Sequence, residues 1–155
     1  MGIAESVPVL VAYPSSRRSV YFRHALSNPP QPMSERSTIT HVPKPWGHET
    51  IWARTDSYVG KILHIKAGEA LSVQYHNVKD ETVYLMSGQL IYRIWNGDTP
   101  HDVPLAIGEA FHVTPGTIHQ MEAVTDCDIL EVSTPHLDDV VRLEDAYGRA
   151  GTSAP

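Results

Sequence analysis

Residues 42–135 are divided into many short runs of β-branched, aromatic or alternating apolar residues, each bounded by turn-forming residues. Runs of this kind predict β-strands. The predicted strands are residues 49–54, 59–66, 71–76, 82–86, 89–95, 110–113, 118–124 and 128–133. Since no helical run separates them, we expect an all-β fold, either an antiparallel sandwich or a barrel. Twelve prolines and ten glycines in 155 residues also argue against a helix bundle.

Two local patterns refine this expectation. The Asn96-Gly97 pair predicts a tight hairpin, because a type I′ turn needs positive φ at both central positions. Residues 137–147 mix acidic and apolar positions and predict a short C-terminal helix, the single helix expected in this chain.

The chain divides into three predicted regions. Residues 1–40 are interrupted by prolines and are expected to form a partly extended N-terminal arm. As an alternative, a short run within this arm adds a strand to a sheet edge, even on a neighbouring subunit. Residues 41–149 form the predicted barrel, and residues 150–155 form a disordered tail.

Charge and cysteine content exclude several classes of function. Twelve basic and eighteen acidic residues give a formal net charge of -6, which argues against nucleic acid or an anionic membrane surface as a partner. No apolar run approaches the roughly 20 residues that span a bilayer. The single cysteine, Cys127, excludes an internal disulfide framework. We therefore expect a cytoplasmic protein.

Four polar residues on predicted strands form a candidate metal site. Gln74 and His76 are two positions apart on one strand, so both side chains point to the same face. Glu81 opens the next strand, and His119 begins another one much later in the chain. An amide oxygen, two imidazoles and a carboxylate can hold a divalent metal with positions left for water or substrate. The alternative is that these are ordinary polar residues at strand ends.

The same residues lie in two motifs that resemble those of the cupin superfamily. The first runs from Gly68 to His76 and continues with Glu81 and a closing glycine; the second runs from Gly108 to His119 through a Pro-Gly turn. The resemblance implies a single-domain cupin, that is, a double-stranded β-helix or jelly-roll barrel. This chain differs at Gln74, where many cupins have a histidine.

Further motifs resemble the C-terminal cupin domain of type II mannose-6-phosphate isomerases. They are Lys44-Pro-Trp-Gly47, Lys61, the Leu-Ser-Val-Gln-x-His segment that ends at His76, and residues 138–149. The resemblance covers residues 42–149, without the nucleotidyltransferase domain that precedes the cupin in bifunctional members. It therefore implies a stand-alone cupin.

This resemblance also implies a ligand set and a substrate class. One divalent metal ion, with zinc favoured over manganese, nickel or iron, would be held by Gln74, His76, Glu81 and His119. Lys61 and Arg142 would contact the anionic group of a sugar phosphate, although each can also be an ordinary surface residue. The family's His-His-His-Arg-x-Glu stretch is altered at residues 77–79, and Gln120 replaces a basic residue. These differences bear on the substrate more than on the fold.

The predicted activity is that of an aldose–ketose isomerase, which needs a metal and a base near the reacting carbons. No residue is assigned as this base, because the inward positions near the metal are mostly apolar. Two alternatives therefore stay open. One is an accessory cupin that binds a small polar ligand without turnover, and the other is an iron-dependent oxygenase. Beyond a small-molecule substrate, the expected partner is a second copy of the chain in a homodimer.

Overall fold

The computed structural model describes residues 34–151, which contain eleven strands and no helix. The described strands belong to one compact unit, Glu35–Pro155. Nearly all of the predicted N-terminal arm, and most of the predicted tail, lie outside the described residues. Among these residues, no helix has the length and apolar character needed to cross a membrane.

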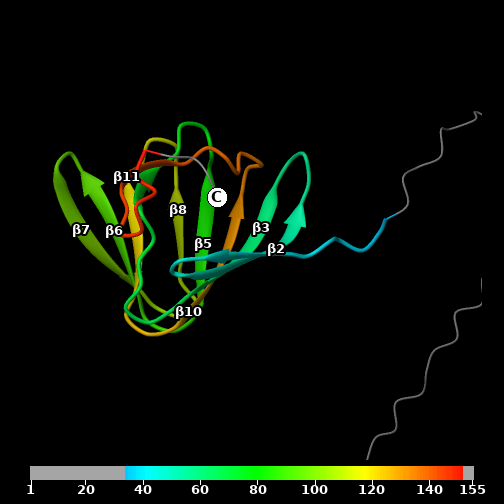
Figure 1. The fold of residues 1–155 in the computed structure, drawn as a ribbon, viewed down its shortest axis with the longest axis horizontal. Coiled ribbons are helices and arrows are strands. Elements are labelled where there is room, and N and C mark those ends of the chain that lie inside the picture. Colours follow the sequence, from blue (N-terminus) through cyan, green and yellow to red (C-terminus); the bar gives the residue numbers. More distant parts are fainter. Residues whose placement is uncertain (1–33, 152–155) are drawn as a thin grey trace, which may run out of the picture. The chain divides into compact units, whose positions relative to one another are not determined.

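Two antiparallel sheets make up the fold (Figure 1). The first sheet has the order β1(Thr40–Lys44), β2(Gly47–Arg54), β3(Val59–Ile65), β10(Cys127–Ser133), β5(Glu81–Ser87), β8(Ala110–Val113). The second has the order β11(Val141–Glu144), β4(Val73–Tyr75), β9(His119–Ala123), β6(Leu90–Asn96), β7(Thr99–Leu105). The sequence therefore folds into the predicted all-β arrangement.

The core lies between the two sheets because buried and exposed residues alternate along the strands. In β5, Glu81, Val83 and Leu85 are buried while the residues between them are exposed. The same alternation buries His119 and Met121 in β9. Strand geometry directs alternate side chains to opposite faces, so these polar and apolar residues share one interior. The main core residues are Trp46, Leu63, Ile65, Val83, Leu85, Leu90, Tyr92, Met121 and Ile129.

The predicted C-terminal helix is wrong. Residues 141–144 form β11, which pairs with β4 so that Arg142 lies opposite Gln74. The segment before it turns at residues 137–138. The β-branched pair Val140 and Val141 suits a strand, and pairing with β4 outweighs the weak helical pattern.

Two further strands, β1 and β7, lie outside the predicted set. Strand β7 contains Pro100 and Pro104, which usually argue against a strand. It lies at the edge of its sheet and pairs with β6 alone, so its prolines interrupt no second ladder. Strand β1 is likewise an edge strand.

The predicted hairpin between β6 and β7 is present, but its turn differs from the expected type. Asn96 pairs with Thr99, so the loop consists of Gly97 and Asp98. Gly97 has φ of +61°, and no residue other than glycine has a positive φ in the described chain. A two-residue turn with positive φ at its first central residue only is type II′, whereas type I′ needs positive φ at both. The turn is therefore type II′.

Candidate metal centre and its pocket

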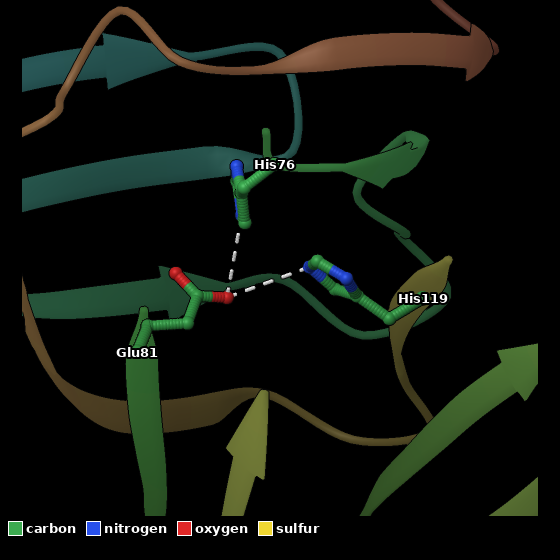
Figure 2. Close-up of side chains that lie close together, drawn as sticks. All are labelled: His76, Glu81 and His119. Carbon is green, nitrogen blue, oxygen red and sulfur yellow. Dashed lines mark ion pairs between the residues drawn. The ribbon is translucent and has the colours of Figure 1, made fainter. Parts of the chain in front are cut away.

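Three buried side chains converge inside the fold, as Figure 2 shows. The Nε2 atom of His76 lies 3.5 Å from Oε1 of Glu81, and the Nε2 atom of His119 lies 3.4 Å from the same oxygen. Two ligands bound to one zinc ion at tetrahedral angles are separated by about 3.4 Å. The spacing of these atoms therefore fits ligands of one shared ion.

Hydrogen bonds on the far side of each ring fix the histidine tautomers. The Nδ1 atom of His76 lies 2.5 Å from the backbone oxygen of Asp139, and Nδ1 of His119 lies 2.9 Å from that of Thr117. Carbonyl oxygens only accept hydrogen bonds, so each Nδ1 carries a hydrogen, and Nε2 is the nitrogen available as a metal ligand. Both Nε2 atoms are buried and have no hydrogen-bond partner. A histidine whose Nδ1–H is bound by a carbonyl oxygen while its Nε2 faces another polar group is the arrangement typical of metal-ligating histidines.

Asp139 holds the loop that carries His76. Its carboxylate accepts hydrogen bonds from the backbone N–H groups of Asn77, Val78 and Lys79. Although partial burial would raise the pKa of Asp139, these hydrogen bonds hold it below the ordinary value. One residue thus fixes both the 77–79 turn and the orientation of the His76 ring.

Lys79 fixes the other oxygen of Glu81. Its ammonium group donates hydrogen bonds to Glu81 Oε2 and, at 2.8 Å, to Glu131 Oε1. Burial by itself would raise the pKa of Glu81, but the Lys79 charge lowers it well below the ordinary value. Glu81 is therefore ionised, with Oε1 left to face the two histidines.

A row of alternating charges continues from Glu81 along one wall of the pocket. Lys61 lies between Glu131 and Glu49, with Nζ–O distances of 3.7 and 3.6 Å. Lys44 follows, with its Nζ 3.7 Å from Glu49. In order, the row is Glu81, Lys79, Glu131, Lys61, Glu49 and Lys44. The buried Lys61 is thus one member of a charged framework and not an exposed residue at a strand end.

This wall belongs to a pocket of about 300 Å³ that His76 and Glu81 also line. Gln74 lies in the same lining, on β4 directly opposite His119 in the strand register. Its side-chain oxygen accepts a hydrogen bond of 2.7 Å from the hydroxyl of Ser72. The structure thus brings His76, Glu81 and His119 together as one cluster, with Gln74 beside them and engaged by Ser72.

Basic side chains from the C-terminal segment and from β1 also line the pocket. Arg142 is buried and lines the pocket together with Lys44 and Arg149. Burial lowers the pKa of Arg142, and the nearby positive charge of Arg149 lowers it further. Burial also lowers the pKa of Lys44, and the positive charges of Arg149 and Arg142 lower it further. Arg149 also forms an ion pair with Asp145 at 2.8 Å. Like charges held this close favour an anionic ligand.

Sequence reasoning missed Lys79 and Arg149, although both had a signal. Lys79 stands two residues before Glu81, and Arg149 closes the C-terminal motif. Gln120, which replaces a basic residue of the family, does not face the cluster. Its side chain bonds to Arg93 and to the backbone of Leu71, on the strand face opposite to His119.

The sequence comparison decides the family. A family model described as "Mannose-6-phosphate isomerase C-terminal" matches residues 31–145. The chain belongs to this family. Mannose-1-phosphate guanylyltransferase ManC of Salmonella typhimurium is 34% identical over 113 residues, which are 70% of this chain and 23% of that protein. Mannose-1-phosphate guanylyltransferase of Escherichia coli is 34% identical over 120 residues, 74% of this chain and 24% of that protein. The family member described here spans about a quarter of the length of these relatives.

Comparison with solved structures shows the cupin fold. The capsular polysaccharide assembling protein CapF of Staphylococcus aureus matches with a TM-score of 0.59 and 20% identity, over 70% of this chain and 35% of that one. KdgF of Halomonas sp. has a TM-score of 0.56 and 20% identity, covering 66% and 92%. Oxalate decarboxylase of Bacillus subtilis, which has Mn(II) centres, has a TM-score of 0.61 and 13% identity, covering 70% and 31%. At these identities, the matches establish the fold alone.

Proposed function

We propose that this cupin binds one divalent metal ion and acts on a sugar phosphate as an aldose–ketose isomerase. The convergence of His76 Nε2, His119 Nε2 and Glu81 Oε1 at a pocket carries the metal assignment. Gln74 would supply the fourth ligand after exchanging its bond with Ser72 for the ion. Imidazole and oxygen ligands of this kind suit zinc first, with manganese, nickel and iron as further candidates.

The charge of the pocket supports an anionic substrate. Six basic and four acidic side chains line it, for a net formal charge of +2 in a chain whose net charge is -6. Arg142 and Arg149 would bind a phosphate group, because guanidinium groups match phosphate oxygens in charge and geometry. Lys61, which is paired with two carboxylates, would contribute to the positive field of the same wall.

The isomerase reaction moves a proton between neighbouring carbons of an open-chain sugar. When bound, the metal would supply Lewis-acid polarisation of the substrate oxygens. The residues of this chain would fix the sugar's position: Arg142 and Arg149 would hold the phosphate, and the metal ligands would face the sugar oxygens. Substrate bound in the pocket would displace water around the reacting carbons.

The test is interconversion of mannose 6-phosphate and fructose 6-phosphate by the purified chain. Zinc-loaded protein is expected to catalyse it, and protein treated with chelator is expected to lose the activity and regain it with zinc. Arg142→Met is expected to raise KM for the sugar phosphate, while Lys66→Met, at an exposed lysine outside the pocket, serves as the matched control. No turnover by metal-loaded protein, at any metal tested, would refute the isomerase proposal.

Binding without turnover is the second candidate, and one observation favours it. Three of the four acidic residues that line the pocket, Glu49, Glu81 and Glu131, are paired with lysines. A paired and buried carboxylate is a poor general base. Tight binding of mannose 6-phosphate in calorimetry, without exchange of its C2 hydrogen in deuterated water, would support this candidate. Tightly held iron with oxygen uptake would instead support an oxygenase.

A further inference from the structure

Some buried polar atoms near the candidate metal centre have no hydrogen-bond partner, and a metal ion would account for only part of them. In the described part of the chain, four buried side-chain atoms have no hydrogen-bond partner: His76 Nε2, His119 Nε2, Tyr92 OH and Ser133 Oγ. The two nitrogens belong to the candidate metal centre. The two hydroxyls do not, and a buried hydroxyl without a partner is costly.

The ring of Tyr92 lies against the candidate centre. Tyr92 is fully buried in β6, and its ring stacks on His119 with centroids 5.9 Å apart and planes 10° apart. Phe111 also stacks on Tyr92, with centroids 4.5 Å apart. A phenylalanine would make the same ring contacts, so packing accounts for the ring and not for the hydroxyl.

The charged neighbours of this hydroxyl come from the opposite sheet. Strand β6 belongs to the sheet that carries His119, whereas Glu81 and Glu131 lie on β5 and β10 of the other sheet. Burial raises the pKa of Tyr92, and the negative charges of Glu81 and Glu131 raise it further. The Tyr92 hydroxyl is buried and bonds to neither carboxylate.

Ser133 places the second unpartnered hydroxyl beside the same carboxylate. It lies directly opposite Glu81 in the pairing of β10 with β5, and both side chains are buried. Directly opposite residues have Cβ atoms about 4.5–5.5 Å apart. Ser133 therefore lies beside Glu81, and Tyr92 lies against His119 of the same cluster. A bound oxygen atom between these groups would have polar partners.

We propose that the Tyr92 hydroxyl belongs to the binding site and donates a hydrogen bond to an oxygen atom of a bound water or substrate beside Glu81. The inference rests on the metal centre proposed above and adds a residue to it. If the oxygen belongs to a water that completes the coordination of the ion, Tyr92 contributes to metal affinity. If the oxygen belongs to the sugar, Tyr92 contributes to substrate affinity instead.

Tyr92→Phe removes the hydroxyl alone and tests this proposal. Calorimetry measures zinc binding to metal-free protein and mannose 6-phosphate binding to zinc-loaded protein, and circular dichroism checks the fold. Tyr84→Phe is the matched control, because Tyr84 lies on β5 with its side chain exposed. We expect Tyr92→Phe to weaken one of the two affinities roughly tenfold, and Tyr84→Phe to weaken neither.

The pattern of results separates this inference from the proposed function. Weaker zinc binding assigns the oxygen to water, and weaker sugar phosphate binding with unchanged zinc binding assigns it to the substrate. If the unaltered protein binds both and Tyr92→Phe binds both within about twofold of it, the Tyr92 inference is wrong while the metal centre stands. If the unaltered protein binds no divalent metal, the metal centre itself is wrong, and the Tyr92 inference fails with it.

Discussion

Replacing Lys79 by methionine tests the electrostatic account of the pocket most directly. The Lys79 ammonium is buried and donates to both Glu81 and Glu131. Methionine has a similar length but no charge, so the variant leaves Glu81 without its cation. Glu131 retains Lys61, whose Nζ is 3.7 Å away.

The expected loss of stability follows from the burial of Lys79, Glu81 and Glu131. Removing one partner of a buried ion pair costs about 3–5 kcal/mol, because the remaining charge keeps its desolvation penalty. A loss of this size lowers the melting temperature of a domain of about 120 residues by roughly 12–20 °C. The loss should be smaller in the presence of zinc, since an ion beside Glu81 would replace part of the missing positive charge.

The assay is thermal and urea denaturation with chelator present, then with zinc. Lys66→Met controls for the loss of a lysine at an exposed position. In chelator, the double variant Lys79→Met/Glu81→Gln also removes the carboxylate that has lost its cation, and it should recover part of the lost stability. A Lys79→Met protein within about 1 kcal/mol of the unaltered one in chelator would refute the reasoning, as would a zinc effect of the opposite sign.

The remaining predictions concern the metal ligands, one turn and the assembly. His76→Ala and His119→Ala should each abolish stoichiometric zinc binding in elemental analysis while the β-sheet circular dichroism persists; global unfolding would instead indicate a structural site. Gly47→Ala should destabilise by more than about 3 kcal/mol in urea, because its Cβ would lie 1.9 Å from the backbone oxygen of His64; near-normal stability would contradict this contact. Light scattering at micromolar concentration should give twice the 17.2 kDa of one chain, and a mass of 17.2 kDa would exclude a homodimer.

Most of the fold could be predicted because periodicity reports burial directly. Alternation of apolar and polar residues along β5 and β9 is enough to identify the inward faces of these strands. The C-terminal strand β11 could not be predicted in the same way, since its partner β4 is distant in sequence and local pattern says nothing of that pairing. Strand β7 was not predicted because its two prolines argue against a strand, although an edge strand tolerates them.

In the candidate site, too, local sequence pattern identified some residues, and the roles of others depend on contacts between distant segments. Residue type and spacing identified His76, Glu81 and His119, which the structure brings together. The roles of Lys79 and Tyr92 depend on what lies across the interior from them, and no local pattern encodes that. Lys61 illustrates the difference: sequence marks a lysine of interest, and the structure shows that two carboxylates surround it.

The three clustered side chains come from both sheets: Glu81 from β5 in one, and His119 from β9 in the other. A ligand bound by all three would therefore connect the two layers across the core. Separating the layers would require its release, so occupancy should slow amide hydrogen exchange in both sheets by the same factor, set by ligand concentration over Kd. Ligand binding at this site would then set the opening equilibrium of both sheets, including strands that never touch the ligand.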